Sequence, residues 1–124
     1  MKTLREMMDI VEGADPTQAD IKSVAEWMDT TPNNLNIEIV NEPIQKYIQQ
    51  IKEMYGTFDE NDEDAERTEQ IEDLLKQGAK ALPIYVEKND PDLFVMEGRH
   101  RMVAFWLVGM KTIPVAYCSK KEEK

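Results

Sequence analysis

The strongest constraint on the fold is a switch from apolar to charged and back to apolar residues in the C-terminal third of the chain. The apolar run Leu93–Met96 is followed by the charged segment Glu97–Arg101, which contains Gly98, and then by the apolar run Met102–Val108. This pattern predicts a strand that ends at a glycine and turns directly into a helix. Because the second apolar run has no polar face, we expect that helix to be buried.

The spacing of apolar residues predicts the remaining elements. Helical spacing after capping signals indicates four more helices, over Thr3–Glu12, Pro16–Met28, Asn41–Tyr55, and a segment that ends near Gln77–Gly78. Asp15 is the expected cap of the second of these helices, and Gly56 the expected end of the third. Short apolar or alternating runs indicate strands at Leu35–Val40, Leu82–Val86, Leu93–Glu97 and Ile113–Tyr117. We therefore predict an α+β fold, a small mixed β-sheet with packed helices.

Two strands of this sheet are predicted to pair. Only the turn Lys88–Asp92 separates the strand Ile84–Val86 from Leu93–Glu97, so we expect an antiparallel pair covered by the helix Arg99–Val108. A length of 124 residues fits a single domain. Positions 35–118 form its predicted core, and positions 1–30 an N-terminal helical extension.

Charge and composition limit the classes of partner. A net charge of −10 disfavours duplex DNA binding, because neutralising many phosphates requires an excess of Lys and Arg on the binding face. A local basic site can still hold one nucleotide or small phosphate ligand. No apolar run approaches the roughly 20 residues that cross a bilayer, so we expect no membrane association. The lone Cys118 cannot form an internal disulfide, which indicates a reducing, cytoplasmic location and an inert thiol.

Six of the eight residues in Asp59–Glu66 are acidic. We expect an exposed loop leading into a helix, without a bound ion, because like charges at this density repel one another. A cation site is the alternative, but the segment lacks the glycine and the ligand spacing of a calcium loop.

The Glu97–Arg101 junction is the candidate site. A helix start after a glycine offers free N–H groups and the positive end of the helix dipole to an anion. On this interpretation Gly98, Arg99, His100 and Arg101 bind a phosphate, with Arg101 or His100 adding a charge-assisted hydrogen bond. Glu97 is then a catalytic base or a magnesium ligand, and His100 a general acid–base group. In the structural alternative Glu97 pairs with Arg101, and His100 caps a backbone carbonyl in the core.

The motif Glu97-Gly98-Arg99-His100-Arg101, followed by an apolar helix, Gly109 and Ile113-Pro114-Val115, resembles the ParB/sulfiredoxin superfamily. Its hallmark is an acidic residue and a glycine, a variable residue, and then His-Arg or Arg-Arg at a strand-to-helix turn. The resemblance covers the last third of the chain, and the segments Leu35–Val40 and Pro43–Tyr55 fit it loosely. Small acidic proteins with this ending also resemble phage-encoded proteins.

The resemblance implies a nucleotide site at this turn. Members bind nucleotides there, ATP or CTP, and act as CTP-hydrolysing partition proteins, nucleases or phosphoryl transferases. The cysteine of sulfiredoxin falls at Arg99, which excludes sulfiredoxin chemistry, and no helix-turn-helix follows before Lys124. We therefore predict a nucleotide- or phosphate-binding protein. Its enzymatic activity is left open between a phosphoryl transferase or NTPase and a nuclease, with Mg²⁺ a candidate cofactor.

The competing interpretation is a non-enzymatic interaction protein. On this view the acidic surface of Asp59–Glu66, with Glu69, Glu72 and Asp73, binds a basic host protein or mimics DNA. In that case the protein has the fold of the strand-to-helix turn but no catalytic activity there. The openness of the turn and the side chains that line it distinguish the two interpretations.

Overall fold

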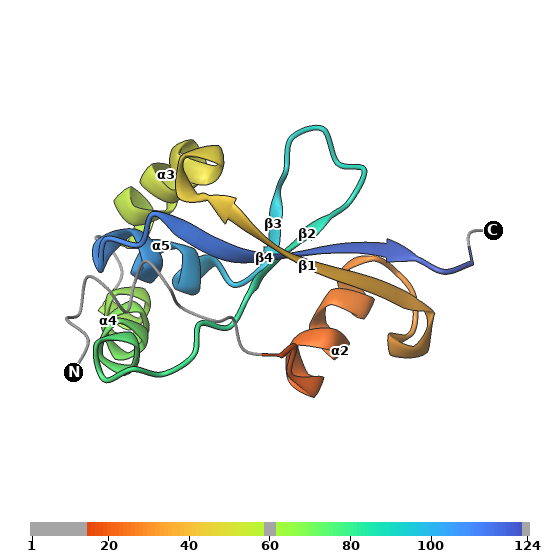
Figure 1. The fold of residues 1–124 in the computed structure, drawn as a ribbon, viewed down its shortest axis with the longest axis horizontal. Helices are drawn as coiled ribbons and strands as arrows, with labels where there is room; N and C mark the ends of the chain where they lie inside the picture. Colours follow the sequence, from red (N-terminus) through yellow and green to blue (C-terminus); the bar gives the residue numbers. More distant parts are fainter. Residues whose placement is uncertain (1–14, 59–61, 123–124) are drawn as a thin grey trace.

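The structure, a computed structural model, describes residues 15–58 and 62–122. The predicted helix Thr3–Glu12 and the start of the acidic segment lie outside the described residues. The long strands β1 (Leu35–Pro43) and β4 (Thr112–Lys120) extend between three helices at one end of the molecule and one helix at the other (Figure 1). The three helices are α3 (Ile48–Phe58), α4 (Asp62–Lys76) and α5 (Arg99–Leu107), and the single helix is α2 (Gln18–Trp27). None of the helices in the described part of the chain has the length and apolar character needed to cross a bilayer.

A four-stranded mixed sheet in the order β1-β4-β2-β3 organises the domain. The strands are β1 (Leu35–Pro43), β2 (Ile84–Glu87), β3 (Val95–Glu97) and β4 (Thr112–Lys120). β4 lies at the centre, antiparallel to β1 and parallel to β2, and β2 pairs with β3 antiparallel. The predicted α+β class, the mixed sheet and the antiparallel pair before the glycine are therefore confirmed.

Helices cover both faces of the sheet. The larger hydrophobic cluster joins one face to α3 (Ile48–Phe58), α4 (Asp62–Lys76) and α5 (Arg99–Leu107), and the smaller cluster joins the other face to α2 (Gln18–Trp27). Side-chain alternation along β2 produces this division, because Ile84 and Val86 belong to the larger cluster and Tyr85 to the smaller one. The second predicted helix is thus one of the two helical layers of the fold.

Several predicted boundaries differ from those of the structure. Thr17, and not Asp15, caps α2, and its hydroxyl accepts a hydrogen bond of 3.1 Å from the Asp20 N–H. Strand β1 continues to Pro43, because its pairing with β4 extends to Thr112 and outweighs the local helix-start signal. Two short 3₁₀ helices, η1 (Pro32–Asn34) and η2 (Ile44–Tyr47), flank this strand.

The predicted end of the third helix at Gly56 is also wrong. The helix α3 runs through this glycine to Phe58, whose side chain is buried in the larger cluster. The packing of Phe58 offsets the cost of about 1 kcal/mol for glycine inside a helix. The predicted end of α4 near Gln77–Gly78 is confirmed. The predicted burial of the apolar part of α5 is confirmed for Met102–Phe105, whereas Trp106 is half-buried and Leu107 is exposed.

Candidate functional site

The strand-to-helix junction has the predicted geometry. Strand β3 ends at Glu97, Gly98 adopts the left-handed conformation with φ +97°, and α5 begins at Arg99. A Cβ atom at position 98 would lie 3.1 Å from the Cα and Cγ2 atoms of Ile84 on β2. Both the backbone conformation and the close approach of β2 therefore favour glycine at this position. The first turn of α5 starts at the edge of the sheet, next to β2.

Arg101 is held by a carboxylate that sequence reasoning did not identify. Its Nη1 and Nη2 atoms donate hydrogen bonds of 2.8 and 2.9 Å to the two carboxylate oxygens of Asp20 on α2, 81 positions earlier in the chain. Nη1 also donates to the Pro83 carbonyl at 3.1 Å, and the Tyr85 hydroxyl donates to Asp20 Oδ2 at 3.0 Å. Burial is the main reason that the pKa of Tyr85 is raised, so this hydroxyl stays protonated. Arg101 thus ties α5 to α2 and the sheet.

His100 is held from the opposite side. Its Nε2 atom lies 2.8 Å from Asp64 Oδ1, in the first turn of α4. Its ring stacks on that of Phe58 with centroids 4.6 Å apart and an interplanar angle of 12°. The structural alternative paired Glu97 with Arg101 and placed His100 on a backbone carbonyl. In the structure Arg101 instead pairs with Asp20, and His100 pairs with Asp64. No local sequence signal identifies these aspartates, because each meets its partner only through the tertiary fold.

The other two side chains of the motif, Arg99 and Glu97, differ in exposure. Arg99 is exposed on the first turn of α5, and Glu97 is half-buried. Glu97 lines a shallow depression of about 420 Å³ together with Ser23, Glu26 and Trp27 of α2. The predicted phosphate-binding residues are therefore adjacent in the fold, but Arg101 and His100 are directed to carboxylates of the protein itself.

An exposed aromatic pair adjoins this depression. Trp27 at the end of α2 and Phe94 just before β3 have ring centroids 5.9 Å apart and are 58% and 45% exposed. The hydrogen bonds of Gln50 on α3, to the Leu93 carbonyl at 2.8 Å and from the Val95 N–H at 3.2 Å, fix the backbone on both sides of Phe94. Two large apolar rings thus lie against each other at the surface, and hydrogen bonds fix the backbone that carries Phe94.

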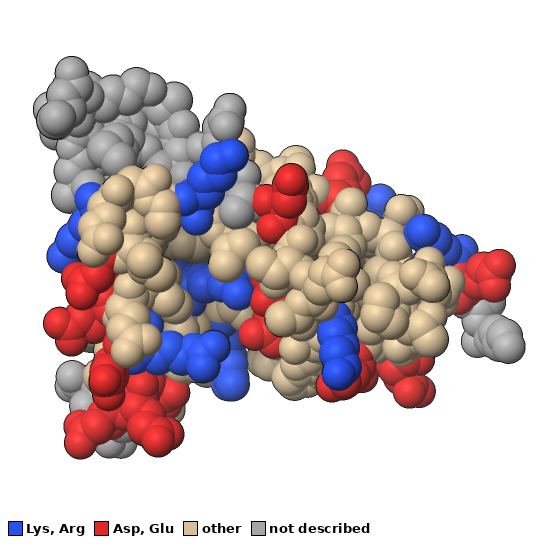
Figure 2. Space-filling model, turned by 90° about the horizontal axis from the view of Figure 1, so that it is seen from below, with Lys and Arg blue, Asp and Glu red and all other residues tan. Residues whose placement is uncertain are grey.

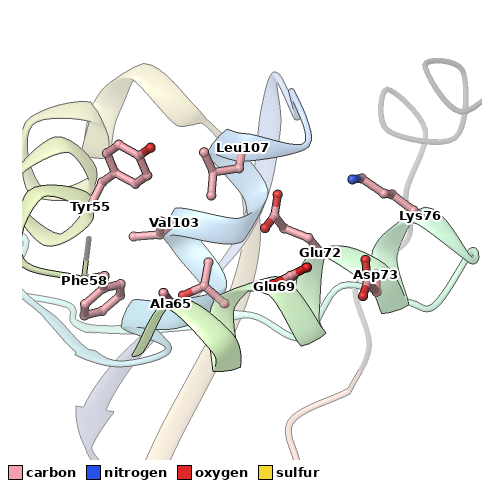
Figure 3. A pocket seen from close by; sticks show the side chains of 10 residues that line it. Tyr55, Phe58, Ala65, Glu69, Glu72, Asp73, Lys76, Val103 and Leu107 are labelled. Atoms are coloured by element: carbon pink, nitrogen blue, oxygen red, sulfur yellow. The ribbon is translucent and has the colours of Figure 1, made fainter. Parts of the chain in front are cut away.

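A separate groove of about 380 Å³ opens between α3, α4 and α5. Figure 3 shows Tyr55 and Phe58 on one side, the acidic side chains of α4 on the other, and Val103 and Leu107 between them. Glu72 points toward Leu107 in this view, and its burial raises the pKa of its carboxyl. The groove combines an apolar floor with an acidic wall formed by Glu69, Glu72 and Asp73, beside which Lys76 supplies a positive charge.

Two further features bear on chemistry. Within residues 15–58 and 62–122, no group of three or more His, Cys, Asp or Glu side chains is placed to hold a metal ion. The magnesium role of Glu97 stays a prediction. Cys118 is buried in the α2-facing cluster, and burial raises the pKa of its thiol to about 12, as expected for an inert cysteine.

Charges of both signs are interspersed on the face of the molecule seen in Figure 2, and in places acidic and basic side chains lie next to each other. The described part of that face presents no continuous basic stripe of the kind that follows a nucleic-acid backbone.

Comparison of the chain with protein-family models, with curated proteins and with solved structures finds no match.

Proposed function

We propose that the protein binds a phosphate-bearing ligand, a nucleotide such as ATP or CTP, at the first turn of α5. The observation that carries the proposal is the left-handed Gly98 between β3 and α5, with the exposed Arg99 directly after it. A helix start in this setting directs backbone N–H groups and the positive end of the dipole at one point. The motif Glu97–Arg101 adds the resemblance to the ParB/sulfiredoxin superfamily, whose members bind nucleotides at this turn.

The contacts of Arg101 assign it a role other than phosphate binding in this proposal. Asp20 occupies both arms of its guanidinium fork and is itself buried. A phosphate that took the fork would leave the Asp20 carboxylate buried without its cation, at a cost of several kcal/mol. The proposed ligand contacts are therefore the backbone N–H groups of residues 98–100 and the side chain of Arg99. Arg101 orients the helix start.

Catalysis, if the bound nucleotide is turned over, falls to the two groups beside the phosphate position. Glu97 is half-buried at the end of β3, where its carboxylate is the proposed base for an attacking water or hydroxyl. His100 is oriented by Asp64 and stacked on Phe58, an arrangement that fixes the position of a proton-transferring ring. The reaction class we propose is phosphoryl transfer or phosphodiester hydrolysis.

A second candidate is the non-enzymatic acidic interaction protein. The specific observation in its favour is that two of the three basic side chains of the motif are already compensated by Asp20 and Asp64. A strand-to-helix junction with no ligand would also have its basic side chains paired with carboxylates of the protein, as His100 and Arg101 are here. On this view the acidic groove and the exposed aromatic pair, and not the turn, carry the function.

Titration calorimetry with ATP and with CTP, each with magnesium, separates the two candidates. We expect wild type to bind one of them, and Arg99→Ala to weaken binding by about 1.5–3 kcal/mol, the range for a hydrogen bond to a charged group. Lys52→Ala, which removes the same charge from an exposed position on α3, is the matched control and should bind like wild type. If wild type binds neither nucleotide at millimolar concentration, the phosphate proposal fails and the interaction protein takes its place.

A further inference from the structure

We propose that the surface formed by Trp27, Phe94, Glu26 and Glu97 is a docking site for an arginine side chain of a basic protein partner. We call these four residues the aromatic-acidic patch. The proposal does not depend on phosphate binding at the turn.

The aromatic half of the patch is preorganised. Trp27 is the last residue of α2, and Phe94 is bracketed by backbone hydrogen bonds to Gln50 and by its own N–H bond of 3.1 Å to Asp90 Oδ2. Trp27 has the largest exposed fraction, 58%, among the exposed large hydrophobic residues of the described chain. A tryptophan side chain has only two χ angles to order on binding, and tryptophan is enriched among residues that dominate binding energies.

The acidic half of the patch selects the charge of the ligand. Glu26 and Glu97 line the same shallow depression as Trp27, with Ser23 as the fourth lining residue and no basic side chain among the four. A guanidinium can stack on an aromatic face and at the same time donate two parallel hydrogen bonds to a carboxylate. Both groups that arginine recognition uses are therefore present within one depression.

The charge of the whole molecule favours the same class of partner. The chain carries 25 acidic and 15 basic residues, and the resulting net charge of −10 attracts a basic partner over a long range. An arginine on a basic protein segment thus satisfies the aromatic pair, the carboxylates and the long-range field together.

The test uses the full chain and three acetylated, amidated hexapeptides of the form Gly-X-Gly-X-Gly-X, with X arginine, lysine or citrulline. Binding is followed through the indole N–H signal of Trp27 in two-dimensional NMR spectra. We expect the arginine peptide to shift this signal, the lysine peptide to bind more weakly, and the uncharged citrulline peptide to have no effect. Equal binding of the citrulline and arginine peptides would overturn the proposal, because recognition would then not involve charge.

Variants locate the binding surface. Trp27→Ala and Glu26→Gln should each weaken the arginine peptide about two- to fivefold, as expected for exposed cation–π and ion-pair contacts. For Trp27→Ala and for the control variant, binding is read from the backbone signals of Ser23 and Glu26. Glu69→Gln is the matched control, because it removes the same charge from the groove between α3, α4 and α5.

The outcome of these variants decides the proposal. A Glu69→Gln effect as large as that of Glu26→Gln would show that the peptide responds only to net charge, and would contradict a defined site. The same conclusion follows if wild type shows no Trp27 shift at millimolar peptide. Phe94→Ala provides a second aromatic variant if Trp27→Ala alters the circular dichroism spectrum.

Discussion

Two carboxylates hold the start of α5 from opposite faces of the sheet, and they differ in burial. The Asp20 and Arg101 side chains are 7% and 18% exposed and form a two-armed pair that Tyr85 and the Pro83 carbonyl complete. The Asp64 and His100 side chains are 30% and 22% exposed and share one hydrogen bond of 2.8 Å. The first pair belongs to the core of the fold, whereas the second is partly open to water.

This difference shows how one short motif can serve both structure and function. Solvent stabilises a partly exposed group when its partner is lost, but a buried charge has no substitute for its partner. Arg101 is therefore committed to the fold, while His100 and Arg99 stay accessible to a ligand. If the buried pair contributes more to stability than the partly exposed pair, the variants that follow should rank in decreasing order of their effect on the free energy of unfolding.

Asp20→Ala should have the largest effect, about 3–5 kcal/mol of destabilisation, because it leaves Arg101 and the Tyr85 hydroxyl without their buried partner. Urea denaturation at neutral pH measures this loss. Asp62→Ala is the matched control, since Asp62 is an exposed aspartate in the first turn of α4, and it should change stability by less than about 0.5 kcal/mol. Equal effects of the two variants would remove the distinction between a core pair and a surface charge.

Gly98→Ala should be the next most damaging change, at about 1–3 kcal/mol. The added Cβ meets Ile84 at 3.1 Å, and alanine tolerates a φ of +97° poorly. Gly56→Ala, at a glycine inside α3 with open space around it, is the control and should be neutral or stabilising. Thermal or urea unfolding of both variants is the measurement, and a stable Gly98→Ala protein would show that the junction is not constrained by β2.

Asp64→Ala should cost about 1 kcal/mol or less, because its hydrogen bond to His100 is partly solvated and the stacking of His100 on Phe58 remains. The same urea experiment compares this variant directly with Asp20→Ala. A loss for Asp64→Ala as large as that for Asp20→Ala would mean that both pairs are structural and would leave the turn without an accessible basic side chain other than Arg99.

A third carboxylate extends the comparison to a more local contact. Glu42 accepts hydrogen bonds from Lys46, four positions later in the chain, and from the Tyr117 hydroxyl, and these contacts hold the pKa of its carboxyl below the usual range. A carboxyl with a lowered pKa contributes stability above its ordinary pKa of 4.5, and this stability is lost as the pH falls through the lower, folded-state value.

The expected effect of Glu42→Gln is therefore small and depends on pH. We expect a destabilisation of about 0.5 kcal/mol at pH 7, which should fade as the pH is lowered toward 3. Urea denaturation of wild type and variant at both pH values is the measurement. A difference that grows at low pH would contradict the assigned direction of the pKa shift.

Much of the fold was predictable because local signals and tertiary packing agree. The apolar run before Gly98, the turn before β3 and the unbroken apolar helix α5 specify the same hairpin and junction that the structure contains. The prediction failed where long-range contacts override local signals. Asn41–Pro43 has the pattern of a helix start, but β4 supplies hydrogen-bonding partners that extend β1 to Pro43.

The site was predictable only in part, for a related reason. Consecutive helical residues point about 100° apart, so the sequence alone implied that Arg99, His100 and Arg101 face in different directions. It did not identify which one faces solvent, because that depends on Asp20 and Asp64, residues 81 and 36 positions away from their partners. The position of the turn was therefore predictable from the sequence, whereas the orientation of each of its side chains depends on tertiary contacts.

The most direct test of the account is a titration of the isotopically labelled protein with ATP and with CTP, in the presence of magnesium and followed by amide NMR. We predict that the largest shifts fall on the N–H signals of Gly98, Arg99 and His100, and that Arg99→Ala weakens the response while the Asp20–Arg101 pair stays intact. Absence of shifts at these three residues with millimolar nucleotide, or shifts confined to residues remote from the turn, would contradict phosphate binding at the start of α5.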